Sequence, residues 1–171
     1  MKVVEGRVDV DDVDAFLDDL AAIGEEYDCA VQAFDADLVA GRDHLDAAVE
    51  RADRSFDRGE NVARDRAVEI LLYAAGRRQI NRALRMGVSS GENDVAVVVH
   101  PENETDAAAA ARPAASAVGD LLTPAETLGA DRIDREAVRE FFDVGDAELA
   151  ATDATLADLV CERVALLDVE K

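Results

Sequence analysis

The stretch Glu69-Ile-Leu-Leu-Tyr-Ala-Ala-Gly-Arg-Arg-Gln-Ile80 decides how this chain folds and where its basic surface lies. Its apolar run has no polar side, so it predicts a helix that is covered on more than one side. Gly76 predicts the end of that helix, because glycine readily adopts the left-handed conformation that closes helices. Arginine and amide side chains follow at once. The sequence thus places a donor-rich segment directly after a rigid, buried element.

This segment is basic within a strongly acidic chain. The formal net charge is -21, from 39 acidic and 18 basic residues, yet residues 64–88 contain six arginines against Asp65 and Glu69. Such local enrichment indicates an anionic partner that is bound at one place. The alternative is that these arginines pair with the chain's own carboxylates, as exposed salt bridges that contribute little each.

The acidity itself is typical of a protein adapted to a salt-rich cytoplasm. Only Lys2 and Lys171 are lysines, and the other sixteen basic residues are arginines. At molar salt the Debye length falls to roughly 3 Å, so dense surface carboxylates no longer repel one another and keep the protein hydrated. An acidic tail that binds basic proteins fits less well, because the acidic residues are spread along the chain.

Length and composition predict one globular domain over residues 1–171, since 171 residues with 49% hydrophobic content suffice for one core. Cys29 and Cys161 form no CxxC pair and have no neighbouring histidine, so we expect neither a metal site nor a cofactor. No apolar run approaches the ~18 residues of a membrane span, and no secretory leader is recognisable. We expect a soluble, cytoplasmic protein that makes no membrane contact.

The periodicity predicts a mixed α/β fold of the α+β type, with a small central sheet of about four strands and helices packed around it. Gly6 is a candidate bulge, and Gly24 is the expected end of the first helix. The expected strands are 1–9, 29–34, 95–99 and a short edge strand at 128–133. The expected helices are 13–23, 42–58, 61–75, a short one that carries Ile80, Ala83 and Leu84 and stops at Gly87, then 113–122, 135–142 and 155–169.

The sequence contains no convincing catalytic centre. Gly87-Val-Ser-Ser-Gly91 matches the GxSxG string, but a helix precedes it and a strand follows, which reverses the order that a nucleophile elbow requires. His44 and His100 have no metal-binding or catalytic spacing, and His44 is expected to be structural. A small hydrolase using Ser89 or His44 remains the third and least favoured interpretation.

Several stretches together resemble the TPRKB family, the KEOPS subunit that docks on the PRPK-type kinase. They are Gly41-Arg-Asp-His-Leu45, the block from Glu69 to Ile80 with the following Ala83 and Gly87, and the ending Glu162-Arg-Val-Ala-Leu-Leu167. The resemblance implies a non-catalytic subunit of the assembly that makes N6-threonylcarbamoyladenosine on tRNA. It further implies binding to the kinase subunit and to the 3′ CCA end of tRNA.

Carried over by position, the resemblance implies tRNA contacts at Arg64 and at the block Arg78-Gln79-Ile80. We further expect Arg78 and Gln79 to touch the tRNA directly while Ile80 anchors the segment in the core. The surrounding basic surface extends this set. The full expected tRNA-binding set is Arg64, Arg77, Arg78, Gln79, Ile80, Arg82 and Arg85. Single-stranded ends are recognised by stacking and by hydrogen bonds to bases, for which planar guanidiniums and amides are suited.

The last helix is the expected kinase-docking element, because the resemblance covers it and its apolar stripe is wide for one small domain to cover. The expected partner-binding residues are Leu156, Leu159, Val160, Arg163, Val164 and Leu167. We expect part of this stripe to be exposed. The competing function is a purely protein-protein adaptor, in which the Arg-Gln-Ile block only packs the core and no RNA is bound.

Overall fold

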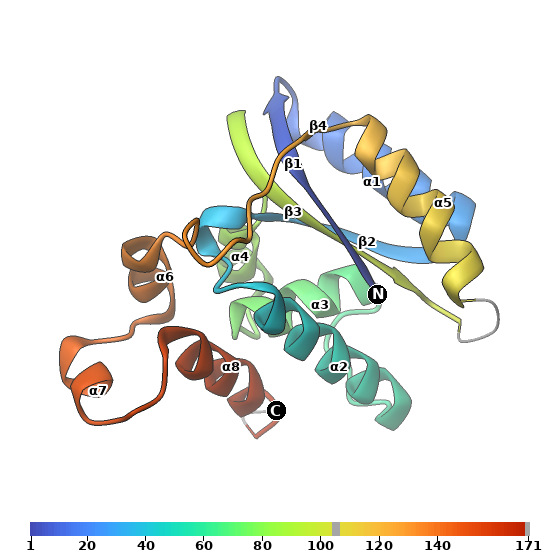
Figure 1. The fold of residues 1–171 in the computed structure, drawn as a ribbon. Coiled ribbons are helices and arrows are strands. Elements are labelled where there is room, and N and C mark those ends of the chain that lie inside the picture. Colours follow the sequence, from blue (N-terminus) through green and yellow to red (C-terminus); the bar gives the residue numbers. More distant parts are fainter. Residues whose placement is uncertain (104–106, 170–171) are drawn as a thin grey trace.

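The fold is built on one antiparallel sheet. The computed structural model describes residues 1–103 and 107–169. In these ranges the strands are β1 (Lys2–Val10), β2 (Cys29–Asp35), β3 (Gly91–Pro101) and β4 (Thr123–Pro124), in the order β2-β3-β1-β4 (Figure 1). Every neighbouring pair is antiparallel. Helices cover both faces, which confirms the expected α+β class.

The central strand β3 is apolar without alternation because both of its faces are covered. Val95, Val97 and Val99 belong to one buried cluster, and Ala96 and Val98 belong to another on the opposite face. The sheet therefore separates two hydrophobic cores, and each core is closed by its own layer of helices.

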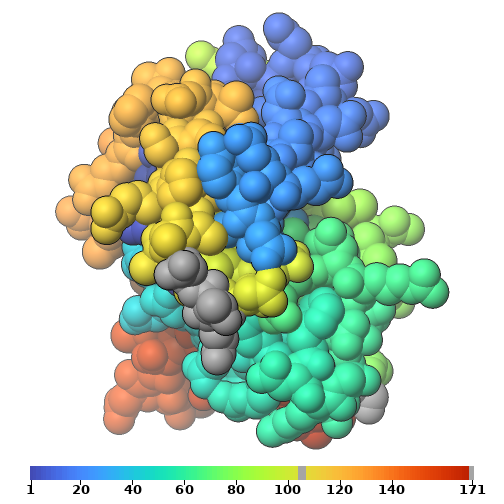
Figure 2. All heavy atoms as spheres, turned by 90° about the vertical axis from the view of Figure 1, so that its right-hand side faces the viewer, coloured from blue at the N-terminus to red at the C-terminus, as the bar shows by residue number. Residues whose placement is uncertain are grey.

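One layer consists of α1 (Val13–Tyr27) and α5 (Ala107–Asp120), which lie side by side (Figures 1 and 2). Phe16 and Leu20 of α1 and Val118 of α5 close this core. The expectation that Pro113 begins a helix was wrong. Pro113 lies inside α5, which starts six residues earlier.

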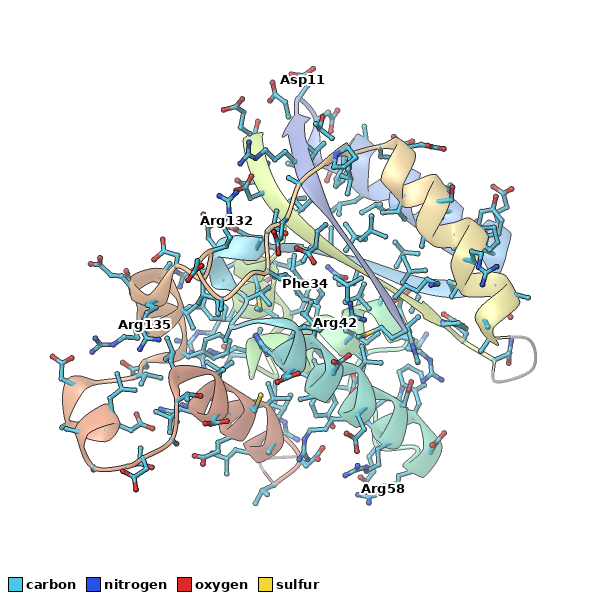
Figure 3. The ribbon with its side chains drawn as sticks, viewed as in Figure 1. Asp11, Phe34, Arg42, Arg58, Arg132 and Arg135 are labelled. Atoms are coloured by element: carbon cyan, nitrogen blue, oxygen red, sulfur yellow. The ribbon has the colours of Figure 1, made fainter. Side chains whose placement is uncertain are left out.

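The second layer contains α2 (Arg42–Arg58), α3 (Arg66–Ala75), α6 (Arg135–Phe142) and α8 (Leu156–Leu166). Phe34 of β2 is fully buried in the core that these helices form with the sheet (Figure 3). Short elements connect them. These are the 3-10 helices η1 (Ala36–Leu38) and η2 (Leu84–Met86), and the helices α4 (Ile80–Ala83) and α7 (Asp146–Ala150).

The predicted edge strand at 128–133 was wrong, because the chain turns there: the Arg132 N–H donates to the Gly129 carbonyl oxygen at 2.8 Å. A distant side chain also holds the backbone where this stretch begins. The Glu5 carboxylate accepts from the N–H groups of Thr127 and Leu128, at 2.7 and 2.8 Å. The observed edge strand is β4, which pairs with β1 at Gly6. A Cβ on Gly6 would lie 2.7 Å from the Thr123 carbonyl oxygen, so glycine permits this approach and forms no bulge.

Other predicted helix boundaries also moved. α8 ends at Leu166 and not at residue 169. α1 continues past Gly24 to Tyr27, where Asp28 adopts the left-handed conformation and closes the helix. α3 begins at Arg66 with Asp65 as its N-cap, five residues later than expected. The start is delayed because the Glu69 carboxylate holds the preceding backbone in a non-helical turn, as described below.

Candidate nucleic-acid interface and partner surface

Helix α3 is a rigid platform for the segment that follows it. Every residue from Glu69 to Ala75 is buried. The Glu69 carboxylate is buried too, and it accepts from the N–H groups of Val62 and Ala63 at 3.0 and 2.8 Å and from the Ser55 hydroxyl at 3.1 Å. These bonds join α2, its connection and α3 into one unit, and they satisfy a charge that would otherwise be costly to bury.

His44 ties the other end of α3 to the start of α2. Its Nδ1 accepts from the Ala40 N–H at 3.1 Å, which leaves Nε2 as the protonated nitrogen that donates to the Ala74 carbonyl oxygen at 2.7 Å. Complete burial lowers the pKa of His44 to about 4, opposed by the bond to Ala74. The ring is therefore neutral, and the expectation of a structural histidine is confirmed.

Gly76 turns the chain away from α3. It has a φ of +58°, and the N–H groups of Gly76 and Arg77 cap the helix by donating to Tyr73 and Leu72. A Cβ at Gly76 would lie 3.4 Å from Cβ of Arg163 on α8. Glycine thus serves both the left-handed turn and the close packing of α8.

Arg77 and Arg85 are held against α6 by Phe141. The Arg77 guanidinium donates to the Phe141 carbonyl oxygen at 3.0 Å and lies 5.9 Å from the centre of the Phe141 ring. The Arg85 guanidinium lies 6.0 Å from the same ring centre. Phe141 was absent from the expected site, and its place beside Phe142 on a short helix is only a weak signal of an aromatic contact.

Most residues that follow Arg77 in this segment are exposed. Arg78, Gln79, Ile80 and Arg82 are all exposed. Ile80 is 45% exposed, so the expectation that it anchors the segment in the core was wrong. It is the first residue of the one-turn helix α4, directly after the chain has turned outward.

Ala83 and Met86 anchor the segment in place of Ile80, since both are fully buried. They lie three residues apart, so they share one side of the α4–η2 turn. Leu84 points to the outside and is 53% exposed. Leu84 was absent from the expected site, although a leucine beside basic residues is a common feature of binding surfaces.

Arg64 lies apart from this exposed group. It is exposed before the first turn of α3, whereas Arg78 follows the last turn. Ten helical residues separate the two ends of α3, which corresponds to about 15 Å along its axis. Among the residues that the structure describes, neither Arg64 nor Arg82 forms an ion pair.

The apolar stripe of α8 is not available to a partner in this structure, contrary to expectation. Its members are all buried in the core with α2 and α3: Leu156, Leu159, Val160, Val164 and Leu167. The predicted capping box of Thr155 and Asp158 is confirmed. The stripe is needed to cover the far side of α3, because that helix is apolar nearly all round.

Arg163, the charged member of the expected partner-binding set, is bound within the chain. Its guanidinium forms a bidentate pair with Glu148, at 2.7 and 2.8 Å, and this pairing lowers the pKa of Glu148 and raises that of Arg163. The outward side of the chain's end instead presents Leu166 and Val169, which are 50% and 79% exposed.

The serine and the second histidine considered for catalysis make contacts within the fold. Ser89 lies in the turn between η2 and β3, where its N–H and hydroxyl contact the Asn93 side chain. His100 pairs with Asp53 at 2.8 Å. Within residues 1–103 and 107–169 there is no group of three metal-binding side chains. None of the helices described is long and apolar enough to cross a membrane.

One known protein family matches most of the chain. The sequence model of the family described as kinase binding protein CGI-121 matches residues 8–168. A direct search of curated protein sequences finds no match. The matched range contains the α3 platform, the exposed segment after it and α8.

Proposed function

The chain belongs to the family of kinase binding protein CGI-121, and from this membership we propose that it is a non-catalytic accessory subunit of the KEOPS complex. In this role it binds the PRPK-type kinase subunit and the 3′ CCA end of tRNA, and so supports formation of N6-threonylcarbamoyladenosine. The proposed tRNA contacts are Arg78, Gln79 and Ile80, with Arg64 and Arg82 as flanking cations.

The RNA-binding part of the proposal rests on a difference in burial within residues 78–86. Ala83 and Met86 are fully buried, whereas Arg78, Gln79 and Ile80 before them are exposed. A guanidinium, an amide and an apolar side chain thus project from a rigid base. This combination suits an unpaired base, which offers a stacking face and a hydrogen-bonding edge.

Arg77 and Arg85 have a supporting role in this proposal. Both guanidiniums lie near the Phe141 ring, and Arg77 also donates to a backbone carbonyl. They restrain the segment on either side of its exposed residues, so the segment loses less conformational entropy when it binds. They also keep positive charge next to the proposed contact residues Arg78, Gln79 and Ile80.

Salt makes stacking and geometry more important than charge here. On single-stranded nucleic acid, log K falls by about 0.7 per neutralised phosphate for each tenfold rise in salt. In a salt-rich cytoplasm little purely electrostatic affinity remains. The affinity then depends on planar contacts, for which arginine and glutamine are better suited than lysine.

The kinase-docking surface is proposed at the outward side of the α8 end. Leu166 and Val169 are exposed there, beside the exposed Glu162 one turn earlier. Exposed apolar residues with a charged neighbour are typical of the centre and rim of a protein interface. This surface replaces the buried stripe as the docking candidate.

The second candidate function is a protein-protein adaptor without RNA contact. The exposure of Ile80 and Leu84 favours it, because two large apolar side chains beside one another also suit a protein partner. Binding of tRNA with and without its CCA end, measured in molar KCl, separates the two candidates. Preference for the CCA-bearing tRNA supports the first, and equal or absent binding supports the second.

A further inference from the structure

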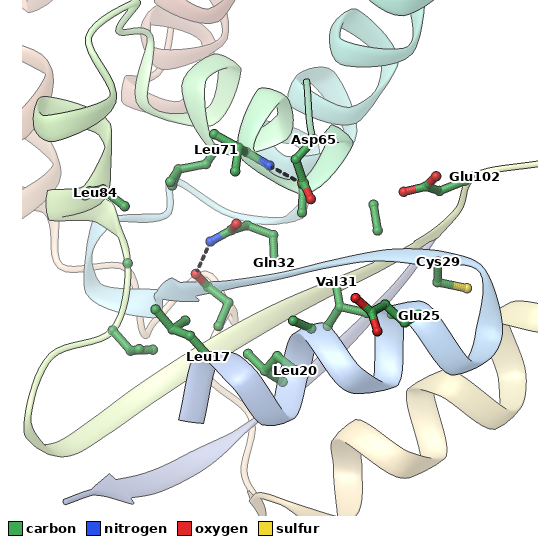
Figure 4. A pocket seen from close by; sticks show the side chains of 18 of the residues that line it. Leu17, Leu20, Glu25, Cys29, Val31, Gln32, Asp65, Leu71, Leu84 and Glu102 are labelled. Atoms are coloured by element: carbon green, nitrogen blue, oxygen red, sulfur yellow. Dashed lines mark hydrogen bonds between the residues drawn. The ribbon is translucent and has the colours of Figure 1, made fainter. Parts of the chain in front are cut away.

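A groove of about 690 Å³ runs along the outer edge of β2, far from the α8 surface (Figure 4). β2 is the terminal strand of the sheet, so one side of its backbone is not taken up by β3. α1 and α3 pack on opposite faces of this strand. They form the two walls of the groove.

The register identifies which backbone groups face the groove. The Glu102 N–H donates to the Asp28 carbonyl oxygen at 3.0 Å, so this pair is hydrogen-bonded. Hydrogen-bonded and non-hydrogen-bonded pairs alternate along an antiparallel ladder. Val31 and Ala33 are therefore in non-hydrogen-bonded positions toward β3, and their N–H and C=O groups point to the open edge.

Gln32 supports this assignment. Its side-chain amide donates to the Ala33 carbonyl oxygen at 2.9 Å (Figure 4). A side chain thus occupies one of the acceptors that a neighbouring strand would use. Such local bonds protect an open edge, and a stronger partner can displace them.

The walls of the groove are apolar. Leu17 of α1 lines one wall and is 39% exposed, and Leu84 of η2 lines the other. Val68 and Leu71 of α3 continue the second wall. Side chains of a strand added to β2 would alternate between the two walls, because successive residues point to opposite faces.

The groove is acidic, and most strongly so at one end. Its acidic lining residues are Asp14, Glu25, Asp28, Asp65 and Glu102. Figure 4 shows Glu25, Cys29 and Glu102 gathered on the side away from Leu17 and Leu84. Among the described residues that line the groove there is no lysine or arginine. At contact distance, where salt screens least, these carboxylates favour a basic segment and disfavour phosphates.

We propose that this groove binds an extended peptide segment of a partner protein as an added strand, with apolar residues followed by lysines or arginines. The main chain of the peptide pairs with Val31 and Ala33 and displaces the Gln32 amide. Its apolar side chains contact Leu17 and Leu84, and its basic end lies beside Glu25 and Glu102. None of the residues that the peptide would contact is a proposed tRNA contact, so the proposal stands or fails independently of tRNA binding.

The test uses a synthetic peptide, acetyl-TVTVAKRK-amide, whose basic residues reach the acidic end when it pairs antiparallel to β2. Binding is measured by calorimetry in 2 M KCl, and exchange of the Val31 and Ala33 amide protons is followed by NMR. We expect exchange at both amides to slow at least tenfold when the peptide is bound. Methylation of alternate peptide nitrogens removes the donors and should weaken binding at least tenfold.

Two variants make the test specific. Leu17→Glu changes an exposed wall residue and should weaken peptide binding at least tenfold. Leu166→Glu, a matched change on the exposed side of α8, should leave it unaltered. The proposal is overturned if neither the peptide nor its reversed sequence binds at 1 mM, or if binding leaves the two amides unprotected. It is also overturned if an RNA oligonucleotide ending in CCA protects those amides and the peptide does not.

Discussion

The Nε2–H of His44 donates to the carbonyl oxygen of Ala74 at 2.7 Å and so joins the first turn of α2 to the last turn of α3. This bond requires a neutral ring with the proton on Nε2, since Nδ1 is already an acceptor from Ala40. The platform beneath the exposed arginine segment therefore depends on the protonation state of one buried histidine.

We expect this dependence to appear as a loss of stability in mild acid. Burial lowers the pKa of His44 to about 4 from an unfolded value of 6.5, so the unfolded chain binds the proton more readily. The contribution of His44 is complete above pH 6.5 and falls as the pH drops toward 4, by about 3 kcal/mol in total.

The measurement is the difference in pH dependence between the native protein and His44→Gln. Both are unfolded with denaturant at several pH values between 4 and 7.5, at constant molar salt. Carboxylates titrate equally in both, so their effect cancels in the difference. If the two free energies of unfolding fall in parallel with pH, His44 is not the group responsible.

A second prediction concerns the buried carboxylate of Glu69. Glu69→Ala leaves the N–H groups of Val62 and Ala63 and the hydroxyl of Ser55 without their acceptor. We expect the free energy of unfolding to fall by about 2–4 kcal/mol, because unsatisfied buried donors are costly. Glu60→Ala, at an exposed position nearby, should change it by less than about 0.5 kcal/mol.

A third prediction tests the proposed tRNA contact. Arg78→Ala should weaken binding of CCA-bearing tRNA by about 1–3 kcal/mol, the range for a lost stacked or bidentate base contact. Arg78→Lys should restore little, because it keeps the charge and loses the plane. Arg112→Ala, an exposed arginine on α5, is the matched control. Equal losses at both positions, or the same loss with CCA-less tRNA, would contradict a specific contact.

The fourth prediction separates docking from folding on α8. Leu166→Asp, at an exposed position, should abolish co-purification with the kinase subunit while the melting temperature stays nearly unchanged. Val160→Asp, at a fully buried position, should unfold the protein, because it places a charge in the core. Retained co-purification of the folded Leu166→Asp and Val169→Asp variants would place the kinase interface elsewhere.

Local sequence patterns predicted helices well where periodicity and end signals were both clear. The ranges 42–58 and 135–142 were predicted as observed, because amphipathic periodicity and clear end signals such as Gly59 define them. The strand predicted at 128–133 failed because the chain turns between Gly129 and Arg132, and because the Glu5 carboxylate, over 120 residues away, holds the backbone where the stretch begins. No local pattern reports such a bond.

In the candidate site, too, local patterns predicted some features, and tertiary packing decided the others. The apolar run and Gly76 correctly predicted a buried helix that delivers polar residues outward. The sequence could not decide which apolar residue faces inward in a helix of one turn, so Ile80 was assigned to the core in place of Ala83. It could not show that the α8 stripe is consumed by covering α3, since that depends on tertiary packing.

The last prediction concerns the charge of the whole chain. With 39 acidic residues in 18.3 kDa and a net charge of -21, the folded state is destabilised by its own charge wherever screening is weak. The Debye length grows from roughly 3 Å in molar salt to about 10 Å at 0.1 M, so each carboxylate then repels many more neighbours. We expect the melting temperature to fall by many degrees when KCl is lowered from 2 M to 0.1 M.

A pH change separates this repulsion from the effect of His44. If the melting temperature at 0.1 M KCl partly recovers when the pH is lowered from 7 to 5.5, reduced repulsion between carboxylates is the cause, because the contribution of His44 to stability falls over that range. A melting temperature independent of KCl would contradict adaptation to a salt-rich cytoplasm and would assign the acidity to partner binding.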